Sequence, residues 1–154
     1  MRYSPWLFLT LTLCACSPEP VPFDSVADVE QLMLTVIDPA ADVYWDSVGT
    51  VMTMEGTEEY APSTLQEWEA VRNAAIVVSE AGNLLLMPGR IQEGEQWTEM
   101  ALALVSSGRK ALAAAENRDP EAVFTAGGDL YLVCADCHAA FAPEALNSAF
   151  TLDD

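Results

Sequence analysis

The chain has 154 residues, of which 51% are apolar, and its 24 acidic and 6 basic side chains give a formal net charge of −18. Its apolar content is too high for its acidity to keep it disordered, and its length suits one domain. The charge argues against a surface that binds nucleic acid or anionic lipid headgroups directly.

The N-terminus is typical of an export signal. An apolar run over residues 5–13 follows a positively charged start. The run is too short to span a bilayer as a helix but fits the apolar region of a secretory signal. It ends in the sequence LCAC at residues 13–16, which resembles the lipobox of bacterial lipoproteins. This resemblance predicts a signal peptide over residues 1–15 and lipidation of Cys16. The alternative is an ordinary secretory signal that leaves Cys16 free.

Residues 16–24 are rich in proline and predict a stiff, extended tether. By the same resemblance, Ser17 after the lipid-bearing cysteine favours sorting to the outer membrane of a Gram-negative host. Without residues 1–15, five basic side chains face 24 acidic ones, a formal −19. We therefore expect a soluble domain on a lipid anchor, with partner proteins that present a basic face.

Apolar periodicity predicts four helices and no convincing strand. The first covers residues 25–48 and is interrupted at Asp38-Pro39, either by a kink or by a restarted helix. Residues 49–62 are expected to form a loop. The second helix begins after a cap at Ser63 or Thr64 and ends at residues 87–90. Its expected core side, and that of the first helix, include Val26, Val29, Leu32, Met33, Val36, Ile37, Leu65, Trp68, Val71, Arg72, Ala75, Val78 and Leu85.

The third helix is expected over residues 95–116 and the fourth over residues 121–140. Asp119 caps the fourth helix, with Pro120 at its first position. Gly127-Gly128 would let a neighbour approach the backbone closely, and Pro143 ends the helix. Four helices with short connections predict an all-α, up-down-up-down bundle over residues 25–142, followed by a tail over residues 143–154. The expected core positions of these two helices are Trp97, Met100, Ala101, Leu104, Leu112, Phe124, Leu130 and Tyr131.

The segment Cys134-Ala135-Asp136-Cys137-His138 is the attachment signature of c-type haem. Two cysteines three residues apart lie on one side of a helix, so that each thiol can add across one haem vinyl group. His138 then projects beneath the ring as the proximal iron ligand. It is the only histidine of the chain. The motif therefore predicts one covalently bound haem.

Three other interpretations of the motif are weaker. A redox-active CxxC is expected beside a βαβ pattern. A structural zinc site needs four ligands, and Cys14 and Cys16 lie far away in the leader. A Cys134–Cys137 disulfide without haem stays open.

A four-helix bundle with CxxCH near the end of its last helix resembles the cytochrome c′ superfamily, over about residues 25–140. The resemblance implies a haem inside the bundle and a first-helix residue facing the iron. Met33 matches that position, so the resemblance implies that Met33 is a possible distal ligand of the iron. The alternative is that Met33 only fills space in the core, as methionines on a core stripe commonly do. Departures from the family pattern are Ala135-Asp136 between the cysteines, where a basic residue is often found, and Pro39 in the first helix.

Other residues have secondary roles in this interpretation. Met52 and Met54 rank below Met33 as iron ligands, while Met87 and Met100 are expected in the core or at helix ends. Arg72 and Arg90 are candidates for pairing with haem propionates, although a salt bridge is the commoner role for either. The tryptophans expected to line the core or the haem pocket are Trp45, Trp68 and Trp97.

Electron transfer is the function that the sequence favours, because His138 and Met33 together would raise the reduction potential and close the iron to other ligands. The alternative is a protein that binds NO or CO at five-coordinate haem, if Met33 only packs nearby. No nucleophile and base occur together, so we do not expect an enzyme. Homodimers are common in the family, but the sequence assigns no exposed apolar stripe to a dimer interface.

Overall fold

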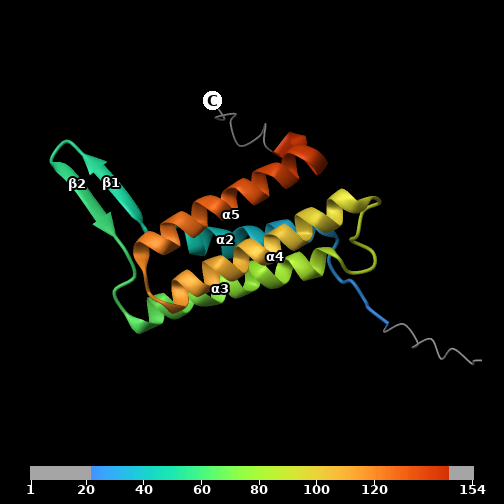
Figure 1. The fold of residues 1–154 in the computed structure, drawn as a ribbon, viewed down its shortest axis with the longest axis horizontal. Helices are drawn as coiled ribbons and strands as arrows, with labels where there is room; N and C mark the ends of the chain where they lie inside the picture. The colour runs from blue at the N-terminus through green and yellow to red at the C-terminus, as the bar shows by residue number, and fades with distance from the viewer. Residues whose placement is uncertain (1–21, 146–154) are drawn as a thin grey trace, which may run out of the picture.

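The computed structural model describes residues 22–145, which form a mostly helical, bundle-like domain with one small sheet (Figure 1). The predicted signal peptide, the lipidation at Cys16 and most of the predicted tail lie outside the described residues. The elements in chain order are α1 (Val29–Leu32), the π-helical segment η1 (Met33–Ile37), α2 (Asp38–Trp45), β1 (Gly49–Thr53), β2 (Gly56–Tyr60), α3 (Leu65–Leu85), α4 (Glu95–Glu116) and α5 (Pro120–Phe141).

The first helix starts later than predicted. Asp28 caps it, because its side chain accepts a hydrogen bond from the Gln31 backbone N–H at 2.8 Å, and the Gln31 side chain completes a capping box. Residues before the cap are therefore not helical. Val26, which was expected on the core side, is 93% exposed. Ser25 instead donates a hydrogen bond to the Pro88 carbonyl at 3.0 Å.

The interruption at Asp38-Pro39 takes the form of a π-helical segment within one helical run from Val29 to Trp45. The Asp38 N–H donates to the Met33 carbonyl, five residues back. Pro39 has no N–H and cannot make the α-helical bond to Thr35, so the register change occurs where that bond is missing. The helix neither stops nor restarts here.

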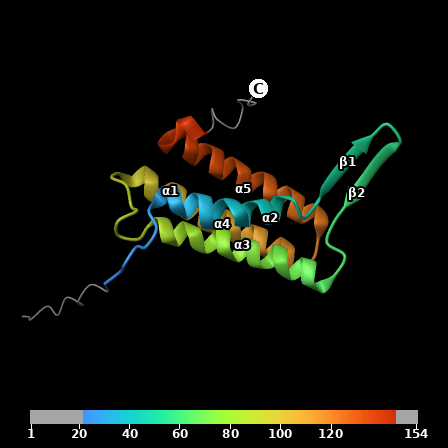
Figure 2. The same cartoon turned by 180° about the vertical axis from the view of Figure 1, so that it is seen from behind.

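The prediction of a loop over residues 49–62 is wrong. β1 and β2 pair in an antiparallel hairpin, with the register running from Gly49↔Tyr60 to Thr53↔Gly56. Gly56 adopts a φ of 147°, which a glycine accepts at the turn. The segment was predicted as a loop because it is rich in Gly, Thr and Glu, although it also contains residues that favour strands, such as Val51 and Tyr60. The hairpin projects from one end of the bundle (Figures 1 and 2).

Small residues bring α3 and α4 together along most of their length. A Cβ on Gly108 would lie 2.7 Å from the Ser79 backbone, and one on Gly82 would lie 2.6 Å from the Ala101 carbonyl oxygen. The Ser79 hydroxyl donates to the Val105 carbonyl at 3.1 Å across the same interface. The two helices begin and end as predicted within a residue or two, with Thr64 as the cap of α3.

The fourth predicted helix is α5, and its start is confirmed. The Asp119 side chain accepts hydrogen bonds from two backbone N–H groups, and Pro120 occupies the first helical position. A Cβ on Gly127 would lie 3.2 Å from Trp45, so the predicted close approach is confirmed there. At Gly128 it is not, because nothing lies within 4 Å of a Cβ on that residue.

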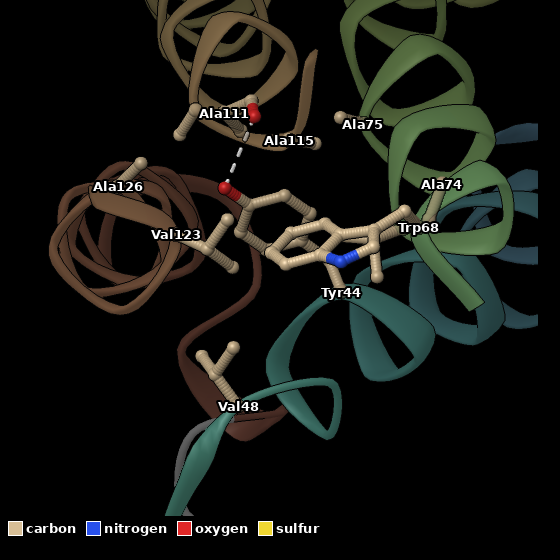
Figure 3. Close-up of a cluster of buried hydrophobic side chains, with 11 residues drawn as sticks. Tyr44, Val48, Trp68, Ala74, Ala75, Ala111, Ala115, Val123 and Ala126 are labelled. Atoms are coloured by element: carbon tan, nitrogen blue, oxygen red, sulfur yellow. Dashed lines mark hydrogen bonds between the residues drawn. The ribbon is translucent and has the colours of Figure 1, made fainter. Parts of the chain in front are cut away.

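Two clusters of buried side chains fill the domain. The hairpin-end cluster contains Tyr44, whose hydroxyl donates to the Ala111 carbonyl at 3.1 Å; Figure 3 shows this bond among side chains from four helices. The motif-end cluster includes Leu32, Ile37, Leu85, Trp97 and Leu130. Six expected core residues are outside both clusters. Four of them are exposed, namely Val26, Leu65, Phe124 and Tyr131, and Arg72 and Met100 are half-buried. Among residues 22–145, no helix is long and apolar enough to cross a membrane.

Candidate functional site

The CxxCH motif lies in the last two turns of α5. Cys134 and Cys137 are free thiols and both are half-buried. Their i, i+3 spacing places them on one side of the helix. His138 is also half-buried, and its carbonyl accepts a hydrogen bond from the Ala142 N–H at 2.8 Å, which closes the last turn of α5.

The fold brings the first helix to the motif. Cys134 and Met33 both pack against the motif-end cluster, and Val133 and Phe141 do the same. The Phe141 ring lies edge-on to Trp97, with ring centroids 5.0 Å apart and an interplanar angle of 86°. The last turns of α5 and the π-helical segment that carries Met33, the residue chosen from sequence as the distal ligand, therefore border the same buried cluster.

The environment of the two thiols keeps them protonated at neutral pH. Burial raises the pKa of Cys134 to about 11, with smaller contributions from the nearby charges of Cys137 and Asp38. Burial also raises the pKa of Cys137. Redox-active CxxC motifs depend on a lowered thiol pKa at a helix N-terminus or beside a cation. These cysteines have neither, because they lie near the C-terminal end of α5 and the charge that perturbs Cys134 is an acidic one.

The segment of α5 that carries the motif is apolar but incompletely covered. All four buried residues of α5 precede Tyr131, and none of residues 131–141 is fully buried. Apart from His138, Asp136 is the only acidic or basic residue of that segment, and Leu132 is 60% exposed. A flat apolar group attached to the two thiols would thus meet apolar side chains of the same helix and of the first helix. The donor set and its surroundings fit a haem.

A metal ion held by side chains alone does not fit as well. Within the described residues, no three Cys, His, Asp or Glu side chains converge in a geometry that could hold a metal ion.

The two arginines proposed for haem propionates have different surroundings. Arg90 is buried, and its guanidinium donates to the Ala27 carbonyl at 2.9 Å and to the Leu84 carbonyl at 3.2 Å. It therefore ties the segment before the first helix to the end of α3, a role that the sequence did not predict. Arg72 is half-buried and contacts the Asn73 side-chain oxygen at 3.4 Å.

Of the remaining methionines, the two on the hairpin lie apart from the motif. Met52 is on β1 and Met54 is in the turn of the hairpin, where both are exposed at the opposite end of the bundle from the motif (Figure 1). The Met87 sulfur accepts a contact from Arg90 at 3.5 Å. The three predicted tryptophans contribute to the clusters, and the indole N–H of Trp97 donates to the Leu85 carbonyl at 3.0 Å.

Sequence reasoning missed one residue near the motif and one surface that begins at the hairpin end of the domain. Asp38 is close enough to affect the Cys134 thiol electrostatically. Its position beside Pro39 was noticed only as a helix interruption. The surface lies beside the hairpin, where Phe124 and Tyr131 are exposed on α5. The available signal was that both aromatic residues occur at helical spacing with Gly128 between them.

Comparisons with protein families, with curated proteins and with solved structures found no match. The resemblance to cytochrome c′ therefore stays a prediction from the motif and its place in the chain.

Proposed function

We propose that this chain is an exported, lipid-anchored c-type cytochrome that carries one covalent haem and transfers electrons. The observation that carries the proposal is a pair of free, half-buried thiols one helical turn apart, followed by His138, on an apolar and incompletely covered part of α5. Cys134 and Cys137 would each form a thioether bond, and His138 would bind the iron from the proximal side. The bound haem would supply one-electron redox chemistry.

The raised thiol pKa values fit this attachment better than the alternatives. Thioether formation adds S–H across a vinyl group, whereas zinc binding and thiol–disulfide exchange both need thiolate. Cys134 and Cys137 are neutral thiols at pH 7. A Cys134–Cys137 disulfide without haem is the competing state, and it would leave the apolar surface of residues 131–141 without a use.

Met33 is the candidate for the distal iron ligand. It packs against the same cluster as Cys134, and its thioether is a suitable haem ligand. In this proposal the helices run up-down-up-down, and the packing of α3 on α4, of α4 on α5 and of the first helix on α3 supports that order. If Met33 only packs beside the iron, the haem is five-coordinate and NO or CO binding is the function instead.

The location follows from the leader. Cleavage before Cys16 and lipidation of that residue would hold the domain on the periplasmic side of a bacterial membrane, with the outer membrane favoured. Export also brings the chain to the compartment in which bacteria attach c-type haem. Redox partners with a basic face would match the formal −19 charge of the mature chain. A second copy of the chain is a further partner suggested by the family resemblance, and we propose no catalytic activity.

The haem itself is tested by purifying the exported protein and measuring its intact mass and absorption spectrum. We expect the mass of the mature chain plus one haem, and a Soret band that survives denaturation because the bonds are covalent. The double variant C134S/C137S should lose both. D136A, which changes an exposed residue between the cysteines, is the matched control and should keep both. A disulfide mass without haem in the unaltered protein would refute the proposal.

The distal ligand is tested by adding CO to the reduced protein. With Met33 bound, CO should react slowly, and M33A should convert the spectrum to five-coordinate high-spin iron and speed up CO binding. M100A is the control, because Met100 is a half-buried methionine on α4 outside the motif-end cluster. Fast CO binding to the unaltered protein, unchanged in M33A, would favour the gas-binding alternative.

A further inference from the structure

A groove begins at the hairpin end of the domain and extends along α5 as far as Tyr131. It consists of two adjoining hollows of about 700 Å³ and about 310 Å³, which share Val48 and Phe124 in their walls. The larger hollow lies between the base of the hairpin and the start of α5, and the smaller lies between α2 and α5. We call the two together the hairpin-end groove.

The groove offers apolar surface on a rigid floor. Phe124 is 66% exposed and Tyr131 is 53% exposed, which is unusual for two large aromatic side chains on one helix. Between them, Gly128 leaves the α5 backbone uncovered. The floor is fixed by Trp45, whose indole N–H donates to the Gly127 carbonyl at 2.9 Å and whose ring lies edge-on to Tyr131 at 6.2 Å.

The rim of the groove is acidic. Glu59 on β2 and Glu121 in the first turn of α5 line the larger hollow, together with Asp119. The Asp119 carboxylate is occupied by the α5 cap, which leaves the two glutamates available. No Lys or Arg is among the residues that line either hollow. An occupant would therefore combine positive charge with apolar side chains.

The position of the groove favours a protein as its occupant. The segment before the first helix is held at the other end of the bundle, where Ser25 contacts Pro88 and Ala27 contacts Arg90. Figure 1 shows the chain leaving the domain there, opposite the hairpin. The 17 residues of the run Val29–Trp45 separate the two ends by about 25 Å, at 1.5 Å per residue. A membrane reached through the N-terminal segment would lie away from the groove.

We propose that the hairpin-end groove binds a basic segment of a partner protein. Lys or Arg side chains of that segment would pair with Glu59 and Glu121, and an apolar side chain would pack between Phe124 and Tyr131. A second copy of this chain is a poor occupant, because its strong net negative charge opposes close approach of two acidic surfaces. Phe124 and the two glutamates lie at the start of α5 or on the hairpin, and Phe124 is separated from Cys137 by about 20 Å of α5. Tyr131, at the other end of the groove, lies one helical turn before Cys134, so the tests of the groove use Phe124 and the glutamates rather than Tyr131.

The test uses the full exported protein and a fluorescein-labelled peptide of alternating Lys and Leu, measured by fluorescence anisotropy. A peptide in which Ser replaces each Leu has the same charge and tests the apolar part. We expect the Lys/Leu peptide to bind at least about tenfold more tightly. E59Q/E121Q should weaken its binding by about three- to tenfold, the range of two exposed ion pairs. F124A should reduce the preference for the Lys/Leu peptide over the Lys/Ser peptide.

Matched controls separate the groove from general charge attraction. E69Q/E99Q removes two exposed carboxylates on α3 and α4, and L102A removes an exposed apolar side chain on α4. Both should bind as the unaltered protein does. Equal losses in groove and control variants, or equal binding of the two peptides, would overturn the proposal. So would self-association in sedimentation experiments that F124A abolishes, because the occupant would then be a second copy. The Soret band of the same samples reports on the haem separately.

Discussion

The two parts of α5 differ in how far their apolar side chains are covered. In residues 120–130, Val123 and Leu130 are completely buried, and Ala126 and Gly127 are buried beside them. In residues 131–141, which are at least as apolar, no side chain is fully buried. The first part is explained by packing against α4 and the first helix. The second part has the composition of a core but not the burial of one, and it is the part that carries the two thiols and His138.

This difference shows why burial alone is a poor guide to which helical residues matter here. In an ordinary helix bundle, the apolar stripe of a helix extends only as far as the neighbouring helices that cover it. In α5 the stripe continues through Cys134 and Cys137 to Phe141. It is covered only in part, by the motif-end cluster and by the contact of Phe141 with Trp97. Apolar side chains that the other helices leave uncovered could be buried by a group that is attached after synthesis. The comparison between the two parts of α5 can be tested by substitution.

Leu130 and Leu132 provide the largest expected contrast. Leu130 has no exposed surface and belongs to the motif-end cluster, whereas Leu132 is 60% exposed. L130A should lower the free energy of unfolding by about 2–5 kcal/mol, because it removes buried methyl groups and leaves a cavity. L132A should change it by less than about 0.5 kcal/mol. The measurement is the guanidinium midpoint followed by circular dichroism, and equal losses in the two variants would contradict the described boundary of the core.

The packing of the first part of α5 around Tyr44 predicts a pH effect of intermediate size. Burial raises the pKa of Tyr44 from 10.0 to about 12. The folded protein therefore holds the phenol proton more tightly than the unfolded chain does. Below pH 10 the ionisation of Tyr44 does not affect the free energy of unfolding. As the pH rises from 10 toward 12, the free energy of unfolding falls by on the order of 2 kcal/mol, because the unfolded chain loses the phenol proton first.

The variant Y44F isolates this effect. It should lose about 1 kcal/mol at neutral pH, because the hydrogen bond to the Ala111 carbonyl is removed. Between pH 10 and pH 12 its stability should fall less steeply than that of the unaltered protein. The measurement is the denaturation midpoint of each protein as a function of pH. If Tyr44 does not contribute to the loss of stability at alkaline pH, the curves of the two proteins will be parallel.

The sequence predicted the long helices well because their signals are local. Thr64 and Asp119 cap α3 and α5 as expected, and Glu95–Glu116 matches the predicted third helix. The predicted start of the first helix, at residue 25, was several residues too early, because the capping box forms at Asp28. Once the segment is helical, the spacing of Cys134, Cys137 and His138 in the sequence is enough to place the three residues near one another.

What the sequence could not predict depends on contacts between distant residues. The hairpin forms through pairing of Val51 and its neighbours with a strand that contains two glutamates, and neither strand has a clear apolar alternation. The exposure of Phe124 depends on where α5 meets α2. The hydrogen bonds of Arg90 to Ala27 and Leu84 join three segments of the chain, which no local pattern indicates.

Gly127 and Gly128 provide the smallest and sharpest test of the packed part of α5. Alanine is favoured over glycine within a helix by up to about 1 kcal/mol, so G128A should stabilise the protein by about that amount, since its Cβ meets nothing within 4 Å. At Gly127 the Cβ would lie 3.2 Å from the Trp45 ring, which is held by its hydrogen bond to the Gly127 carbonyl. We expect this crowding to cancel the gain in G127A. Thermal unfolding of the two variants should therefore differ in sign or size although the residues are adjacent. Equal stabilisation would mean that Trp45 moves freely and that the floor of the hairpin-end groove is not rigid.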